Sequence, residues 1–321
     1  MNSISRTIVI AALGALIFIA IGIVAPSWLL FTMTKAVGFG LVALGLVGLM
    51  RGGLLSFGQG LYYCGGAYVS GLLAHWAGVT NIVVLLVVGF VAGGLIAAVV
   101  SPFVARYRGI FFAMLTMAIS MVAYGVLAKI AVIGGTDGFN VPKPTLFAFE
   151  LGDSGFGLYS VAVVTAAIAA ALCRTLFDSR LGLLVSASRE NELRLEYLGS
   201  SVYSVSMRNF ILAGALAGLG GTLNGIALGH VDPFFSYWTT SGEMVFIAIL
   251  GGYASVTAVF GTALITELVR SFSGQYFPES WQMLLGIFLL LVIAFLPRGV
   301  GSLWARPTKA STVRVEKEST T

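Results

Sequence analysis

One concentration of charged residues in this otherwise apolar chain lies between residues 179 and 206. Residues 190–198 alternate charged with apolar positions, and Gly199 follows them. This pattern predicts a short amphipathic helix that ends at the glycine. The chemistry it offers is docking, because its charges can pair with a partner protein while Leu193 and Leu195 fill a groove. A solvated interfacial helix without a partner is the alternative.

A glycine-rich turn in the segment 134–157 carries a second group of polar residues. Thr136 and Asp137 are flanked by glycines and can present a hydroxyl, a carboxylate and backbone amides. Asp153 and Asp232 are expected on the same side of the protein, where an acidic face would complement a basic rim on a soluble partner. An Asx-type turn that only holds a helix end is the alternative.

Motifs for covalent or metal chemistry are absent from the sequence. It contains no GxxxxGKS or GxxxxGKT phosphate loop, no HExxH and no GxSxG. The two cysteines and two histidines have no partners at metal or redox spacing. The sequence therefore predicts no catalytic residue, no metal and no cofactor bound by this chain.

The elements that must position these residues are membrane helices. The chain is 58% hydrophobic and 10% charged, with a mean hydropathy of +0.98. That leaves too little polar surface to cover a water-soluble globule. Apolar runs of about 20 residues recur, each long enough to cross a ~30 Å hydrocarbon core as a helix. The first, at 7–24, is longer than the apolar run of a cleaved signal and is predicted to be retained.

The predicted fold is all-α, a polytopic transmembrane helical bundle of eight full spans plus a broken or re-entrant helix pair near 243–272. A second irregular, glycine-rich stretch lies at 51–66. Broken helices in comparable parts of two halves often flank a transport site. A cytoplasmic turn followed by small-residue helix packing is the alternative. The full spans are expected at residues 7–24, 29–50, 59–78, 81–104, 109–133, 158–178, 207–229 and 281–296.

Basic residues orient the bundle, because cytoplasmic loops carry an excess of them. With the N-terminus inside, alternate crossings bring nine arginines and the basic tail 305–321 to the cytoplasmic face of the membrane. The chain carries a formal charge of +5. The nine are Arg6, Arg51, Arg106, Arg108, Arg174, Arg180, Arg189, Arg194 and Arg208.

The same orientation constrains the segment 243–272, which must leave and return on the outer face. It is too short for two full spans of about 20 residues each. We therefore predict an entering and a returning half-helix joined at GGYAS. Gly251 and Gly252 should lie inside the bundle or near the cytoplasmic face, away from lipid, because exposed turns are costly at membrane depth.

Polar and small residues within the apolar segments could line a solute pathway, although small residues also allow helices to pack closely. The charged Glu267 and Arg270 are expected to pair at i, i+3 spacing, and Lys129 to reach the interface. The candidates for the substrate pathway are Gly58, Gln59, Thr116, Asn224, Glu243, Gly251 and Gly252.

The chain resembles the branched-chain amino-acid permease family of ATP-binding-cassette importers, in its LivM-like branch. The resemblance covers roughly residues 40–304 in consistent order. It is carried by GGLLSFGQGLYYCGGAYVSGLL at 52–73, RYRGIFFAMLTMAIS at 106–120, GGTDGF at 134–139, SRENELRLEYLGSSVYSVSMRNFILAGALAGLGGTLNG at 188–225 and LPRGVGSLW at 296–304.

The resemblance implies a permease domain at 1–304 with a coupling loop at 179–206 that docks on a cytoplasmic ATPase. Leu195 departs from the alanine common there in the family. The implied location is a bacterial inner membrane. The implied partners are a second permease (a paralogue or a second copy), two ATPases that use ATP with magnesium, and a periplasmic binding protein. The implied coupling residues are Arg189, Glu190, Asn191, Glu192, Leu193, Arg194, Leu198 and Gly199.

The substrate expected from the resemblance is a branched-chain or other hydrophobic amino acid, with urea, amides and aromatic acids as alternatives. A self-sufficient secondary transporter or a channel competes with the importer subunit. The sequence disfavours a secondary carrier, because its central spans lack the buried carboxylates that couple proton or sodium movement.

Overall fold

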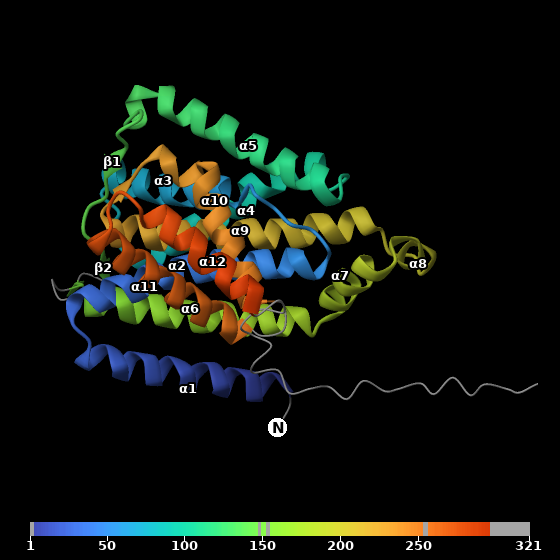
Figure 1. Ribbon diagram of the computed structural model, residues 1–321, viewed down its shortest axis with the longest axis horizontal. Coiled ribbons are helices and arrows are strands. Elements are labelled where there is room, and N and C mark those ends of the chain that lie inside the picture. Colours follow the sequence, from blue (N-terminus) through green and yellow to red (C-terminus); the bar gives the residue numbers. More distant parts are fainter. Residues whose placement is uncertain (1–2, 147–148, 152–154, 253–255, 296–321) are drawn as a thin grey trace, which may run out of the picture.

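The protein is a bundle of helices whose long members run along one common direction (Figure 1). This computed structural model describes residues 3–146, 149–151, 155–252 and 256–295. The helices are α1 (Ser3–Val24), α2 (Ser27–Arg51), α3 (Gln59–Ala77), α4 (Ile82–Val104), α5 (Gly109–Lys129), α6 (Phe156–Phe177), α7 (Arg180–Glu190), α8 (Glu192–Tyr197), α9 (Val202–Leu228), α10 (Trp238–Gly251), α11 (Val256–Tyr276) and α12 (Trp281–Phe295).

Short strands and turns gather at one end of the bundle and α7 and α8 project from the other (Figure 1). We call these the strand end and the α8 end. Strand β1 pairs antiparallel with β4, and β2 pairs with β3. The short elements are β1 (Phe139–Asn140), β2 (Thr145–Leu146), β3 (Phe149–Glu150), β4 (His230–Val231) and the 3-10 helices η1 (Ala131–Ile133) and η2 (Pro233–Ser236).

In the described residues, six helices are long and apolar enough to cross a membrane, namely α2, α4, α5, α6, α9 and α11. The eight predicted full spans are therefore not confirmed. Helix α3 is not among the six, because it carries polar residues such as Gln59 that it buries against other helices. The apolar stretches of α1 and α12 are shorter, at Val9–Val24 and Met283–Val292.

Helix α9 lies at the centre, in contact with α2, α3 and α4. Its Gly218 is held between two neighbours: a Cβ there would overlap the carbonyl oxygen of Gly89 and lie 2.8 Å from the Cα of Gly93. A Cβ on Gly66 of α3 would in turn overlap the carbonyl oxygen of Gly218. Glycine is required here because the three backbones approach more closely than any side chain permits.

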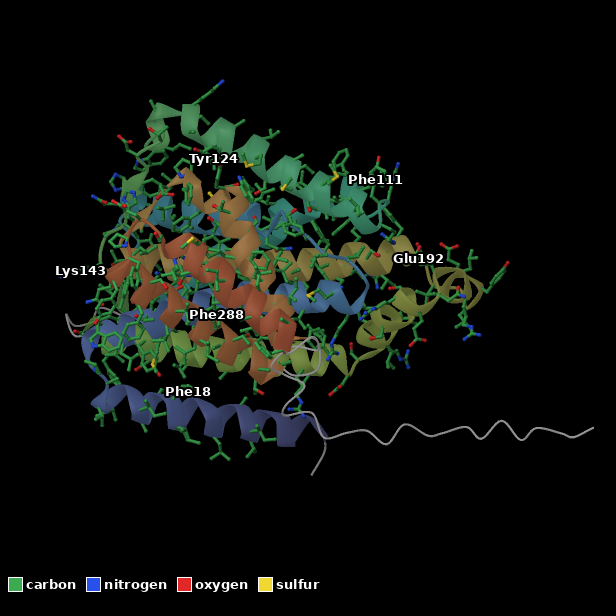
Figure 2. All side chains as sticks on the ribbon, in the orientation of Figure 1. Phe18, Phe111, Tyr124, Lys143, Glu192 and Phe288 are labelled. Atoms are coloured by element: carbon green, nitrogen blue, oxygen red, sulfur yellow. The ribbon has the colours of Figure 1, made fainter. Side chains whose placement is uncertain are left out.

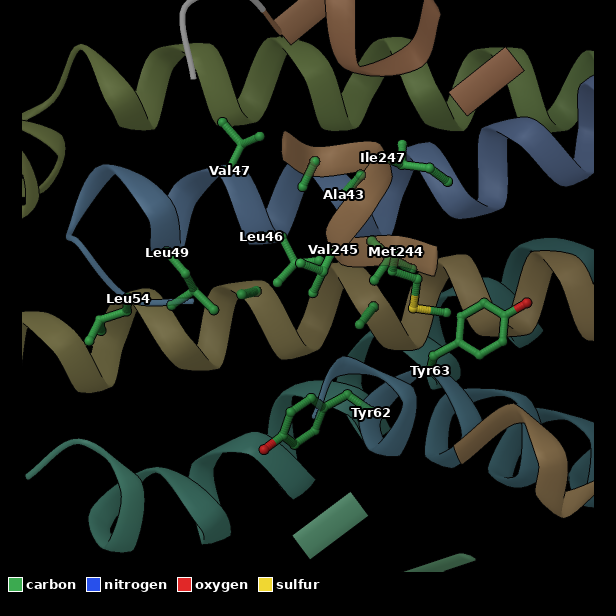
Figure 3. Packing of buried hydrophobic residues seen from close by; sticks show 14 of the residues in the cluster. Ala43, Leu46, Val47, Leu49, Leu54, Tyr62, Tyr63, Met244, Val245 and Ile247 are labelled. Carbon is green, nitrogen blue, oxygen red and sulfur yellow. The ribbon is translucent and has the colours of Figure 1, made fainter. Parts of the chain in front are cut away.

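The predicted helix break between 243 and 272 is present, but its second half differs from the prediction. Helix α10 ends at Gly251, and Gly251 and Gly252 are buried as expected. The 14-residue α10 crosses the direction of α2 and α9 (Figure 3). Helix α11 has 21 residues, so it is not a half-helix. It contains Glu267 and Arg270, whose charges are paired with other side chains.

Several predicted features lie outside the described residues. They are the turn residues 253–255, Asp153, the segment 296–304 and the basic tail 305–321.

Replacing Gly218 by alanine is expected to lower the free energy of unfolding by about 1–3 kcal/mol, the usual cost of overpacking a core. The added methyl group must push α9 away from α4. The matched control is Gly125→Ala on α5, where a Cβ meets nothing within 4 Å and stability should be unchanged or slightly higher. Thermal unfolding of both variants in detergent checks this, and equal midpoints would contradict it.

Candidate functional site

Two interrupted segments meet inside the bundle. One is the stretch 52–58 between α2 and α3, and the other contains η2 and the start of α10. The backbone N–H of Phe57 donates to Thr116 Oγ1 at 3.2 Å, and that of Gly60 donates to Ser241 Oγ at 2.9 Å. A Cβ on Gly58 would overlap the carbonyl oxygen of Thr116. We call this the central junction, made of Gly58, Gln59, Gly60, Thr116, Ser120, Ser236 and Ser241.

Helix α5 is attached to this junction by one narrow stripe. Its buried residues are Phe112, Thr116 and Ser120, one per four positions. Ser120 Oγ donates to the carbonyl oxygen of Ser236 at 2.7 Å, and Ser236 Oγ donates to that of Ser120 at 2.9 Å. Sequence reasoning missed both serines, because their pairing joins positions more than 100 residues apart. The four-residue spacing on α5 was the available signal.

Two buried carboxamides lack the hydrogen bonds that such groups normally make. Gln59 and Asn224 are 0% exposed, and no oxygen or nitrogen of either side chain has a partner of good geometry in the described structure. The Tyr63 hydroxyl is the polar group beside Asn224 that comes nearest to satisfying it. An unsatisfied buried polar group costs about 1–3 kcal/mol. A solute, a water or a second conformation that satisfies them would explain why they are retained.

Four charged side chains form a cluster between α2, α10 and α11, which we call the charged quartet: Lys35, Glu243, Glu267 and Arg270. Lys35 pairs with Glu267, and Arg270 pairs with Glu243 at 3.0 Å. The predicted i, i+3 pair of Glu267 with Arg270 is present but longer, at 4.0 Å. The sequence did not single out Lys35, because its partner is 232 positions away.

The quartet lies next to the aromatic wall of the interior. The guanidinium of Arg270 is 5.8 Å from the centre of the Phe39 ring. That ring stacks on Tyr63 at 5.9 Å, and Tyr63 is the neighbour of Asn224. Glu243, a predicted pathway residue, belongs to this ion-pair cluster through its contact with Arg270. Pairing removes the cost of an isolated charge inside a membrane protein.

Breaking the Lys35–Glu267 pair is expected to destabilise the protein by up to about 3–5 kcal/mol, because the Glu267 side chain is 5% exposed and would keep only the longer contact with Arg270 at 4.0 Å. Lys35→Met and Glu267→Leu each test this. The double variant should recover most of the loss, since no unpaired charge remains there and Arg270 keeps Glu243. Thermal unfolding of the four proteins measures the coupling, and strictly additive losses would contradict the pairing.

At the α8 end, the segment 179–206 forms two helices rather than the one predicted at 190–198. Asn191 separates them, and its side chain accepts from the backbone N–H of Arg194 at 3.0 Å to cap α8. Gly199 follows with φ of +81°, a left-handed conformation that glycine adopts without strain. The break at Asn191 turns α8 away from the direction of α7.

The prediction that Leu195 fills a partner's groove is wrong, because Leu195 is 2% exposed and packs inward. It anchors α8 to its own chain. Leu193, Tyr197 and Leu198 remain 67%, 90% and 76% exposed. We call these three side chains the apolar tip. They are exposed at a helix that the buried Leu195 holds against the rest of the chain.

A charged contact also fixes α8. Arg108 Nε donates to Glu192 Oε1 at 2.6 Å, and its Nη2 donates to Ser206 Oγ at 3.1 Å. Arg108 thus joins α8 to the starts of α5 and α9. Glu192 lies where α8 projects beyond the bundle (Figure 2). The other predicted coupling residues Arg189, Glu190 and Arg194 are exposed on the same helical pair.

At the strand end, Thr136 and Asp137 are not buried, and the Thr136 hydroxyl donates to the Asp137 carboxylate at 3.2 Å. Asp232 does not form an open acidic face with them. It is half-buried, one of its carboxylate oxygens is inaccessible, and it lies against Gly138. The pairing of β1 with β4 draws Asp232 under the turn. In the described residues, no three His, Cys, Asp or Glu side chains are placed to hold a metal.

Comparison with known proteins decides the family. The model of the family described as "Branched-chain amino acid transport system / permease component" matches residues 28–294. The chain belongs to this family. As a member of it, the chain is a multi-pass membrane protein. No solved structure matches the chain.

Relatives come from two branches of the family. The chain is 29% identical over 272 residues to the high-affinity branched-chain amino acid transport system permease protein LivM of Escherichia coli K12, covering 77% of this chain and 64% of LivM. It is 26% identical over 265 residues to LivH of the same organism, covering 77% and 85%. A probable LivH of Methanocaldococcus jannaschii is 25% identical over 267 residues, covering 76% and 82%. The chain thus spans less than two thirds of the length of LivM.

Proposed function

We propose that this chain is the transmembrane permease subunit of an ATP-binding-cassette importer and forms half of the pathway for a branched-chain or other hydrophobic amino acid. The observation that carries the proposal is the apolar tip. Three exposed apolar side chains on a helix held by Leu195 and by the Arg108–Glu192 pair need a protein partner, since water is a poor solvent for them. A cytoplasmic ATPase is the partner that the family supports.

The distribution of basic residues supports the orientation that this function needs. Arg108 contacts α8, and the guanidinium of Arg51 lies 4.1 Å from the Phe177 ring at the start of the α7–α8 loop. Basic residues therefore gather at the α8 end, which the positive-inside rule assigns to the cytoplasm. In a bacterial inner membrane, the strand end would then face the periplasm, where Thr136 and Asp137 would contact a binding protein.

The interior supplies groups suited to a pathway. Gln59 at the central junction and Asn224 beside Tyr63 hold unpaired donors and acceptors. In the proposed complex, the exposed apolar side of α5 packs against a second permease, so the two chains enclose the pathway. Phe111 on that side is 76% exposed (Figure 2). Urea, an amide or an aromatic acid would use the same donors and acceptors.

Reconstituted vesicles distinguish this function from its competitors. The complex with its ATPases and binding protein should accumulate leucine only when ATP is present on the ATPase side. Uptake driven by an ion gradient without ATP would indicate a secondary transporter, and passive flux would indicate a channel. Either result would overturn the proposal, and stimulation of ATPase activity by other solutes would identify a different substrate.

Replacing Leu193 and Tyr197 by serine is expected to lower ATP-driven uptake at least tenfold and leave thermal unfolding unchanged, because both side chains are exposed. The loss should appear as weaker co-purification of the ATPase. The matched control is Leu183→Ser on α7, whose side chain is 67% exposed and lies outside the apolar tip. Equal uptake by both variants would contradict docking at α8.

Replacing Gln59 by methionine is expected to abolish uptake while stability stays equal or rises, because the change removes a buried polar group that has no partner. Asn209→Leu is the matched control. The amide of Asn209 is buried and donates to the carbonyl oxygen of Gly48 at 2.8 Å, so this variant should lose stability. A destabilised Gln59→Met with normal uptake would show that Gln59 is structural.

A further inference from the structure

An apolar groove lies on the flank of the bundle, away from the central junction and the apolar tip. Helices α1 and α11 form its walls and α2 and α6 its floor. Its volume is 290 Å³. On α6 its lining runs from Tyr159 to Arg174, which is about 22 Å along a helix at 1.5 Å per residue. The groove is therefore long and narrow, and it follows the helix direction.

The chain does not fill this groove from its own walls. Gly14 on α1 and Gly261 on α11 line it, and a Cβ at either position would meet nothing within 4 Å. The Tyr159 hydroxyl is satisfied, because it donates to the carbonyl oxygen of Phe18 at 2.9 Å. Four alanines form much of the floor, at positions 166, 167, 170 and 171.

The groove is placed for lipid. Three of its four helices carry segments long and apolar enough to span a bilayer, so the groove lies at the depth of the hydrocarbon core. One leaflet supplies half of a ~30 Å hydrocarbon core. The ~22 Å groove is longer than that half, so it can hold an acyl chain along its full depth in one leaflet. An extended acyl chain of one leaflet matches this shape.

Arg174 indicates which lipid fits. It is exposed at the end of the groove nearest the α8 end, and within the described residues its side chain has no hydrogen-bond or ion-pair partner. Guanidinium groups form strong, charge-assisted hydrogen bonds with phosphate oxygens. Anionic lipids of the cytoplasmic leaflet attract basic side chains at that depth.

We propose that the groove binds one acyl chain of an anionic phospholipid and that Arg174 holds the lipid's phosphate. The lipid would complete the contact between the peripheral α1 and the body of the bundle. The groove is then a structural lipid site and lies apart from the solute pathway.

Native mass spectrometry of the full chain in detergent tests this with added phosphatidylglycerol and phosphatidylcholine. The wild-type chain should retain one phosphatidylglycerol in preference to phosphatidylcholine. Gly14→Leu with Gly261→Leu fills the groove and should reduce that retention at least tenfold. Gly125→Leu is the matched control and should leave retention unchanged, because position 125 has equally open space outside the groove.

Arg174→Gln separates the headgroup from the acyl chain. It should remove the preference for phosphatidylglycerol over phosphatidylcholine, whereas Arg106→Gln, which changes an exposed arginine at the same end, should not.

Equal retention by the groove-filled and wild-type chains would overturn the proposal. So would lipid retention that appears only after residues 305–321 are deleted, since the tail would then be the occupant. Gly261→Leu alone gives the same test if the double variant does not fold.

Discussion

The close approach of α9 to α3 and α4 at Gly218 is the constraint on which the rest of the structure depends. Helices in a bilayer gain little from burying apolar surface against each other, because lipid is equally apolar. Their association rests on close backbone contact, which the glycines at 66, 93 and 218 permit. Because α9 is fixed this way, Asn224 is carried into the interior beside Tyr63, and α3 begins at the central junction.

Polar groups inside this bundle fall into two energetic classes. The charged quartet is internally paired, so its members stabilise the arrangement of α2, α10 and α11. Gln59 and Asn224 are buried without comparable partners, so they destabilise the folded structure. Polar side chains that are costly to bury inside a membrane protein commonly have a functional role. The distinction separates residues that hold the helices from residues that can meet a solute.

The two ends of the molecule are joined through α5. Arg108 ties the start of α5 to α8, and the buried stripe of Thr116 and Ser120 ties its middle to the central junction. The remainder of α5 makes few contacts within the chain. In the proposed complex, a displacement of α8 by the ATPase would therefore act on α5 before it acts on the glycine-packed core, whose helices cannot separate without losing their backbone contacts.

The sequence by itself determined the class of the protein, because its hydropathy requires a membrane as the solvent for its apolar helices. It also located the break after Gly251 and the exposed charged segment that carries α8, since glycine pairs and alternating charge are local signals. Only the tertiary structure decided that Leu195 packs inward, that Glu243 is an ion-pair partner and that Lys35, Arg108, Ser120 and Ser236 matter. Each of those contacts joins residues far apart in the chain, so its energy depends on helix packing that local sequence patterns do not encode.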